Sequence, residues 1–311
     1  MNADQLAGGL MGLLIGDAVG VPYEFNAPTD IPPIAHIDLH PPTGYRRTYP
    51  DIPPGTWSDD GAQALCLLAS LLDCDRLDPD DLGQRFLRWY TEGYFAVDRH
   101  VFDVGNQTAK ALNAIQSGMP VLQAGQLGKQ AKGNGSLMRS LPLTLWHPGS
   151  DAELVADAHL QSQTTHGQIT CQVCCALYCL WARQIAAAIA HPWEAAVATL
   201  RQLYTAPHYA LYLQDLEETI RPDQPPGGEG SGYVVDCLHS ARWVMQSDSY
   251  VGVVKQAIAL GNDTDTTACV AGGLAGLRDG LQAIPEEWRS QLRGQDLVQP
   301  LLERLVERWR G

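Results

Sequence analysis

The chain has 311 residues, of which 45% are hydrophobic and 18% are charged; the charged share is below the usual quarter of a soluble domain, and the balance suggests a compact globular protein and not a disordered or fibrous one. Its formal net charge is −14, and no basic run is long enough to form a nucleic-acid patch. We therefore expect neither a nucleic-acid partner nor an anionic membrane surface, because binding to phosphates relies on Lys and Arg.

The cysteines and the N-terminus favour a cytoplasmic protein. The eight cysteines lack the pattern of a secreted disulfide framework, and Cys171, Cys174, Cys175 and Cys179 fall at helical spacing, as expected for free thiols packed in a core. The apolar N-terminal stretch has no basic region before it, unlike a signal peptide. We also expect no apolar segment to reach the roughly 18 residues of a membrane span.

Helical periodicity dominates the sequence. Apolar residues at i, i+3, i+4 and i+7 predict helices, in chain order, at 61–73, 81–90, 108–117, 151–162, 168–190, 193–204, 234–246, 250–260, 265–279 and 296–309. Alternating runs rich in Val, Ile and Thr are scarce. Two loops rich in Pro or Gly, at 31–55 and 221–232, are long enough to be functional lids. We predict an all-α fold and a single domain over residues 1–311.

Two acidic segments open predicted helices near the two ends of the chain. They carry Ser58, Asp59 and Asp60 in GTWSDDG, and Asp263, Asp265 and Thr266 in GNDTDTT. Such residues can simply cap a helix, but capping needs one acceptor and not four carboxylates. Hard divalent cations need clustered oxygens, and four carboxylates would balance the charge of two such ions. The residues therefore favour a binuclear metal site formed where the two segments meet.

Two other interpretations of the second segment fit the sequence less well. An EF-hand loop beginning at Asp263 would need Gly and Glu where Ala268 and Leu274 stand. The D-x-D-x-T pattern ending at Thr267 also occurs in phosphatases, where it follows a buried strand. Here the preceding residues VGVVKQAIAL are predicted to be helical.

The segment GLLIGDAVGVPYEF, residues 12–25, holds Glu24 between two aromatic residues. That apolar setting could raise the pKa of a carboxyl group for acid–base work, although a plain loop Glu is the alternative. We expect Gly16, Gly20 and Pro22 to let the backbone turn tightly here. In VFDVGNQT, Asp103 and Asn106 precede another helix, where Asp103 could equally be a helix cap.

Three further segments could contact a ligand. The Gly-rich turn KGNGSLMRS, residues 132–140, could cradle a phosphate or a ribose with its amides, with Arg139 as a nearby cation, although it lacks the spacing of a P-loop. His166 is expected at a helix start, and a structural role is its alternative. Tyr233 follows two glycines and could stack on a base if it is exposed, or pack in the core.

Taken in order, these motifs resemble the ADP-ribosylglycohydrolase family. The matching pieces keep the family's order and cover most of the chain: GLLIGDAVGVPYEF, GTWSDDGAQ, FDVGNQT, GNGSLMR, TTHG, GSGYVVDCL and GNDTDTTACVAGGLAG. The resemblance implies a compact orthogonal multi-helix bundle with a binuclear metal cleft that holds two Mg²⁺ ions, or Mn²⁺. It also implies metal ligands at Ser58, Asp59, Asp60, Asp263, Asp265 and Thr266. The family usually has Thr where Ser58 stands, and Ser keeps the hydroxyl.

The resemblance further implies roles in catalysis and substrate binding. Glu24 and Asp103 would be the catalytic carboxylates, with the acid and base roles not assigned between them. The substrate-binding residues would be Asn106, Gly133, Asn134, Gly135, Ser136, Leu137, Met138, Arg139, His166, Ser231, Gly232 and Tyr233.

The function implied is hydrolysis of the bond between ADP-ribose and a protein side chain, most directly arginine, at C1 of the distal ribose. The alternatives are serine-linked or O-acetyl-ADP-ribose as substrate, or an immunity protein that binds and neutralises an ADP-ribosylating toxin. The expected partners are an ADP-ribosylated protein or ADP-ribose, and in the last case an ADP-ribosyltransferase toxin.

Overall fold

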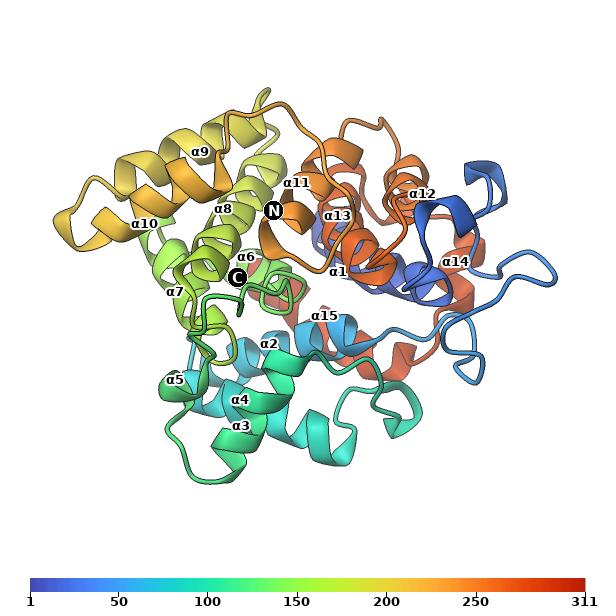
Figure 1. Ribbon diagram of the computed structural model, residues 1–311, viewed down its shortest axis with the longest axis horizontal. Helices are drawn as coiled ribbons and strands as arrows, with labels where there is room; N and C mark the ends of the chain where they lie inside the picture. The colour runs from blue at the N-terminus through green and yellow to red at the C-terminus, as the bar shows by residue number, and fades with distance from the viewer. Residues whose placement is uncertain (311) are drawn as a thin grey trace.

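The computed structural model of the protein describes residues 1–310, and this part of the chain is built from α-helices (Figure 1). It contains no β-strand, only the isolated bridges Gln126–His166 and Gly133–Tyr233. The helices are α1 (Ala3–Gly20), α2 (Asp59–Cys74), α3 (Pro79–Glu92), α4 (Asn106–Gln116), α5 (Val121–Ala124), α6 (Leu141–Trp146), α7 (Asp151–Gln163), α8 (Ile169–Ala186), α9 (Pro192–Leu203), α10 (Ala210–Asp215), α11 (Val234–Val244), α12 (Tyr250–Ala259), α13 (Thr264–Asp279), α14 (Glu286–Gln291) and α15 (Gln295–Arg310). The predicted all-α fold is confirmed.

All of the helices predicted from periodicity are present, with ends that differ by a few residues. The sequence missed α1 and the short helices α5, α6, α10 and α14, which have six residues or fewer. The predicted loops at 31–55 and 221–232 contain no α-helix. Short helices are missed because one or two turns carry too little periodicity to stand out.

Helix α1 corrects the prediction of a tight turn around residues 16–22. Gly16 and Gly20 lie inside the helix, and only Pro22 belongs to a 3₁₀ turn that follows it, Val21–Tyr23. Glycine disfavours a helix when the helix is taken alone. Here the cost is offset by packing, because nearly all of α1 is buried.

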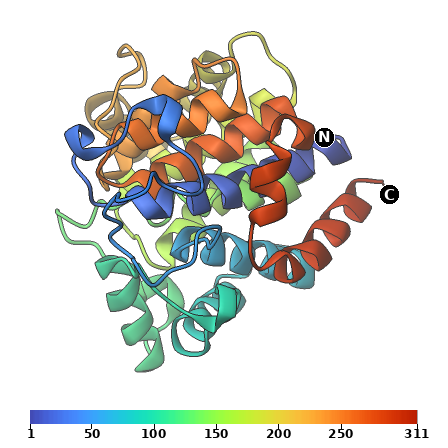
Figure 2. The ribbon, with the colours of Figure 1, turned by 90° about the vertical axis from the view of Figure 1, so that its right-hand side faces the viewer.

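The glycines of α1 form the contact face between α1 and α13, which lie side by side in Figures 1 and 2. A Cβ atom at Gly12 would lie 2.6 Å from the carbonyl oxygen of Gly272, and one at Gly272 would lie 2.7 Å from that of Gly12. Along α1 the contacts move from Gly276 back to Asp265, so the two helices are antiparallel. This arrangement places the end of α1 beside the beginning of α13.

Two helices correct the expectation that no apolar segment is long enough to span a membrane. Ala3–Tyr23 and Ile169–Ala186 both pass by length and composition. Within the fold, 100% and 78% of their apolar windows are buried, as in core helices. The cysteines of α8 are buried in this core, and all eight cysteines of the chain are free.

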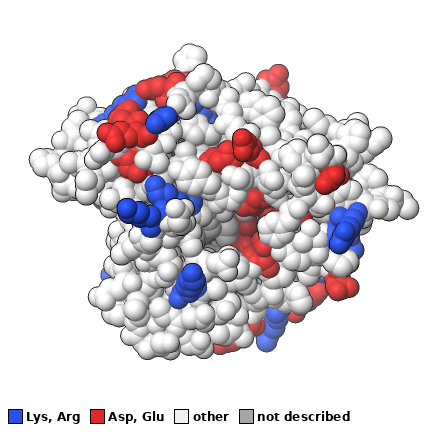
Figure 3. All heavy atoms as spheres, in the orientation of Figure 1, with Lys and Arg blue, Asp and Glu red and all other residues white. Residues whose placement is uncertain are grey.

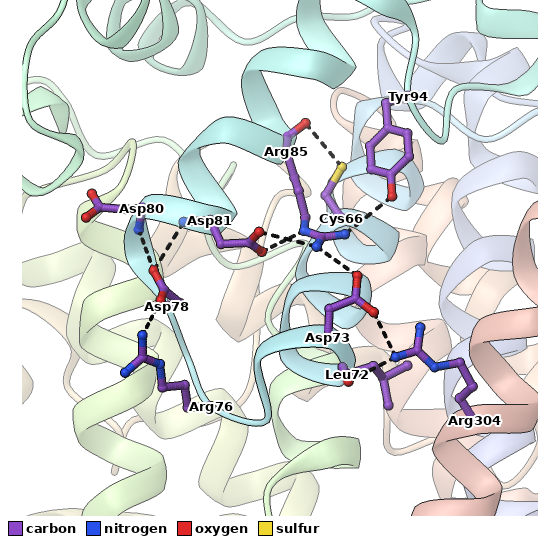
Figure 4. A network of polar contacts seen from close by, with 10 residues as sticks. All are labelled: Cys66, Leu72, Asp73, Arg76, Asp78, Asp80, Asp81, Arg85, Tyr94 and Arg304. Carbon is purple, nitrogen blue, oxygen red and sulfur yellow. Dashed lines mark hydrogen bonds and ion pairs between the residues drawn. The ribbon is translucent and has the colours of Figure 1, made fainter.

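A polar network attaches the C-terminal helix to α2 and α3 (Figure 4). The Arg85 guanidinium of α3 donates to Asp81 at 2.6 Å and to Asp73 of α2 at 2.8 Å. Asp73 also accepts from Arg304 of α15 at 2.8 Å. Asp73 therefore joins three helices, and the two arginines lower its pKa.

Candidate active site

The side chains of Ser58 and Asp17 bond to the backbone amides at the start of α2, so the carboxylates of Asp59 and Asp60 are not needed to cap the helix. Ser58 caps the helix, with its Oγ accepting from the Asp60 amide at 3.3 Å. Asp17 of α1 accepts from the Ser58 amide at 2.9 Å and from the Gly61 amide at 2.8 Å. Burial raises the pKa of Asp17 to about 7. We predicted no role for Asp17 from the sequence, although Asp17 lies in the segment GLLIGDAVGVPYEF.

The start of α13 brings the second acidic pair to the same place. The Thr266 hydroxyl donates to Asp60 Oδ2 at 3.4 Å, which joins the two segments across the fold. Asp263 accepts from the Asn134 amide group at 2.9 Å. The hydroxyls of Thr264 and Thr267 donate to backbone carbonyls and are therefore structural.

Glu24 and Asp103 complete the cluster. Glu24, Asp103 and Asp265 each offer an oxygen within 4.8 Å of the others, and this group could hold a metal ion. Asp103 is not a helix cap, because Gly105 occupies that position and Asp103 has a left-handed backbone, φ 51°. Its Oδ1 accepts from the Tyr49 hydroxyl at 2.8 Å. The tightest carboxylate group thus combines both predicted catalytic residues with one predicted ligand.

The carboxylates are arranged in a way that disfavours their charged forms unless a cation is present. Burial, and then the neighbouring carboxylates, raise the pKa of Glu24, Asp59 and Asp265 well above ordinary values. Both oxygens of Asp265, Oδ1 of Asp60 and Oε2 of Glu24 are buried without a hydrogen-bond partner. Unpartnered buried oxygens on several carboxylates are the donor set that a hard divalent cation requires, so the residues fit a metal site.

Part of this cluster lines a cavity of about 340 Å³, in a face that Figure 3 shows hollowed and edged with acidic side chains, whereas the predicted ligands Ser58, Asp60 and Asp265 do not line it. The predicted residues that line it are Glu24, Asp59, Asp103, Asn106, Gly133, Asn134, Gly135, Met138, His166, Gly232, Asp263 and Thr266. The sequence missed Phe25, Gly105, Gln107 and Thr108, which are neighbours of predicted residues in the chain.

His166 and the Gly-rich turn form another part of the cavity wall, which meets the acids where Asn134 bonds to Asp263. His166 is buried, and burial lowers its pKa to about 3, so the ring is neutral. A Cβ at Gly135 would lie 2.9 Å from the His166 ring, which explains why glycine is needed there. Gln107 accepts from the Gly133 amide at 2.7 Å and ties this turn to α4.

Arg139 was predicted to be a cation near the ligand, but the structure places its side chain in the core. It is completely buried, lies 4.3 Å over the Phe86 ring, and does not line the cavity. It donates to Gln63 at 2.7 Å, and Gln63 in turn donates to Asp59 at 2.9 Å. It also donates to Thr165, which bonds to the His166 ring. Arg139 thus supports cavity residues through intermediaries.

Three other predicted binding residues turn away from the cavity. The Ser136 hydroxyl contacts that of Ser162, and Leu137 is part of the core. The Ser231 hydroxyl donates to Asp236 at 2.8 Å. Tyr233 is 40% exposed and pairs with Gly133 next to the cavity, so of the two predicted settings it has the exposed one.

Comparison with known proteins decides the family. The family model ADP-ribosylglycohydrolase matches residues 2–311. The chain belongs to the ADP-ribosylglycohydrolase family. It is 31% identical to the ADP-ribosylarginine hydrolase Tri1 of Pseudomonas putida, over 98% of this chain and 78% of that protein. It is 26% identical to the ADP-ribosyl-[dinitrogen reductase] glycohydrolase of Rhodospirillum rubrum, over 93% and 90%.

A solved structure agrees with this assignment. The chain matches one described as an ADP-ribosylglycohydrolase-related protein complex with a TM-score of 0.71, at 28% identity and over 98% of both chains. As a member of the ADP-ribosylglycohydrolase family, the chain is an ADP-ribosyl glycohydrolase. The cytoplasmic location, the single-domain organisation and the alternative of a toxin partner stay predictions.

Proposed function

We propose that the protein is a metal-dependent hydrolase that releases ADP-ribose from modified arginine side chains of proteins. The observation that carries the proposal is the convergence of Glu24, Asp60 and Asp265 on one site with buried oxygens that have no partner. Relatives named ADP-ribosylarginine hydrolase, 31% and 29% identical to this chain, support the arginine linkage.

We assign two Mg²⁺ ions, or Mn²⁺, as the cofactor. Their proposed ligands are Ser58, Asp59, Asp60, Asp263, Asp265 and Thr266. When bound, the ions supply positive charge that balances the carboxylates and orients the hydroxyls of the distal ribose. Glu24 and Asp103 each have an oxygen within 4.8 Å of an oxygen of Asp265, so both are near enough to approach the metals as well as the substrate.

The remaining cavity residues would bind ADP-ribose along its length. The turn from Gly133 to Met138 would meet the diphosphate beside the neutral His166, and it offers the amide of Gly135, for which the described residues show no hydrogen bond, as an anion-binding group. Asn106 would contact the distal ribose, and the exposed Tyr233 would stack on adenine. Ser136, Leu137, Arg139 and Ser231 would act from behind this surface, through the bonds and packing described above.

The proposed reaction follows from the carboxylates of Glu24 and Asp103, at the place where the distal ribose would bind. Cleavage breaks the bond between C1 of the ribose and the arginine nitrogen, through a transition state with oxocarbenium character that nearby negative charge stabilises. Of Glu24 and Asp103, one takes a proton from the attacking water and the other gives a proton to the leaving nitrogen. Water supplies the hydroxyl on C1, so the products are ADP-ribose and free arginine.

The test is release of ADP-ribose from an arginine-modified protein with Mg²⁺, with Mn²⁺ and with chelator. Asp59→Asn and Asp263→Asn should lower the rate at least about 100-fold, while Asp248→Asn, an exposed control, should not. A serine-modified protein serves as the second substrate. Metal-independent release, or release from serine alone, would overturn the proposal.

A further inference from the structure

Three aromatic side chains form a surface at the acidic end of the cavity, here called the aromatic rim (Phe25, Tyr49 and Phe102). The ring centroids of Phe25 and Tyr49 are 6.4 Å apart, and those of Tyr49 and Phe102 are 5.1 Å apart. Phe25 lines the cavity and is 62% exposed. An exposed aromatic ring at the mouth of a polar cavity calls for a reason, since burial would stabilise it.

The exposed ring of Phe25 is held in place by a strained backbone. Phe25 has φ 58°, a left-handed conformation that non-glycine residues rarely adopt. Its amide donates to the carbonyl of Asn262 at 2.6 Å, and the Asn262 amide donates to Asn26 at 2.8 Å. The Thr48 hydroxyl fixes the same loop by donating to the carbonyl of Glu24 at 2.6 Å. Strain that neighbouring contacts maintain is common at functional sites.

The aromatic rim is joined directly to the catalytic carboxylates. Phe25 follows Glu24 in the chain, and the Tyr49 hydroxyl donates to Asp103. Arginines of the protein stack on other rings, namely those of Phe86, Tyr94, Trp146 and Trp193, and within residues 1–310 none stacks on the rim. Aromatic faces beside carboxylates, with no cation of their own, are suited to a planar cation from outside.

The position of the rim indicates which part of a substrate it meets. In the proposed function the diphosphate lies along Gly133–Met138 and the distal ribose lies at the acids. The group attached to C1 must then leave the cavity beyond the acids, on the side of Glu24 and Asp103. The rim lies on that side.

We propose that the aromatic rim binds the guanidinium of the modified arginine and thereby favours arginine-linked over serine-linked ADP-ribose. This inference rests on the proposed function. A guanidinium gains from both the ring faces and the carboxylates, whereas a serine oxygen is neutral and small and gains from neither. The rim therefore acts on specificity, next to the groups that perform the reaction.

The experiment compares Phe25→Ala, Phe25→Gly, Phe25→Leu and Phe25→Tyr with the wild type, on arginine-linked and serine-linked peptides of one sequence. Phe25→Gly removes the ring while easing the left-handed backbone, so it separates loss of the ring from misfolding. Leu211→Ala, which removes another exposed apolar side chain outside the cavity, is the control. Binding of free ADP-ribose is measured by calorimetry.

We expect Phe25→Ala and Phe25→Gly to raise KM for the arginine-linked peptide by about 3- to 30-fold, from the usual strength of a cation–π contact. Their effect on the serine-linked peptide and on the Kd for ADP-ribose should be smaller, and Phe25→Tyr should restore the wild-type KM. Equal losses on both peptides, no change in KM, or rescue by Phe25→Leu as complete as by Phe25→Tyr would overturn the inference. If the wild type releases nothing from arginine-linked substrate, the proposed function itself fails, so the two failures are distinct.

Discussion

Replacing Gly20 by alanine tests whether the glycine face of α1 sets the position of the acidic cluster. A Cβ at residue 20 would lie 2.4 Å from the Cα of Asp265 and 2.6 Å from the carbonyl oxygen of Thr264. Ordinary Cβ contacts begin at 3.4 Å, so the start of α13 must move away by about 1.0 Å. Both obstacles are backbone atoms, and rotating a side chain cannot relieve them.

The expected loss has two parts. Overpacking costs about 1–3 kcal/mol of unfolding free energy, and the better helix propensity of alanine returns up to about 1 kcal/mol. A shift of about 1 Å in a catalytic group can cost 100-fold in rate, so we expect kcat/KM for ADP-ribose release to fall by roughly 10- to 100-fold. The rate should therefore suffer more than the stability.

Gly9→Ala is the matched control in the same helix. A Cβ at Gly9 would meet only side chains, that of Leu145 at 3.2 Å, which can give way, and that of Leu277 at an ordinary 3.5 Å. Urea unfolding and steady-state release of ADP-ribose are measured for both variants. If Gly20→Ala were as stable and as active as Gly9→Ala, the contact between α1 and α13 would not position the site. A destabilised but fully active Gly20→Ala would refute the link from packing to catalysis.

Three further outcomes follow from the structure. Mg²⁺ or Mn²⁺ at 100 times its Kd should stabilise the wild type by about 2.7 kcal/mol. Thermal melts with and without chelator measure this stabilisation, which should be lost in Asp265→Asn and kept in Asp248→Asn. Arg85→Ala, with a side chain 13% exposed, should lose about 1–3 kcal/mol on urea unfolding, and Arg304→Ala, 44% exposed, less than about 1; equal losses would contradict this account of the network. Burial lowers the pKa of His159 to about 3 in the folded protein, below its unfolded value of 6.5. The folded state therefore keeps this ring neutral, and the stability that is fully present above pH 6.5 is lost as the pH falls towards 3. The wild type should lose about 2 kcal/mol from this source between pH 7 and pH 5, and a His159→Gln variant with the same pH dependence would show that this histidine is not responsible.

The helices and the acidic segments could be predicted because their signals are local. Apolar periodicity marks α2 and α13, and hydroxyl and acidic residues mark their first turns. Helix α1 was missed because its glycines are typical of turns when each is judged by its own propensity. The spacing of four residues between the glycines at 8, 12, 16 and 20 indicates a helix instead, because it puts them on one helix face. Gly272 and Gly276 repeat that spacing in α13.

The missed and misplaced site residues share a different cause. A motif shows which residues occur together but not which way each side chain points. Arg139 sits in a Gly-rich motif beside a cavity, yet its guanidinium is bound inside the core. Tyr49 comes from a loop with no motif of its own, and only the fold brings its hydroxyl to Asp103. Direction and long-range contact depend on packing, which a single sequence does not specify.

The antiparallel pairing of α1 and α13 explains why acids far apart in the chain form one cluster, and the cluster in turn is the reason for proposing a cation. The N-termini of α2 and α13 offer only partial positive charge. Within residues 1–310 no Lys or Arg lines the cavity, and His166 is neutral. If the carboxylates are charged, their compensation comes from outside the chain, as in the proposed metal site. Glycines that contribute no side chain to the site thus decide both where its charges meet and how much charge a cofactor has to supply.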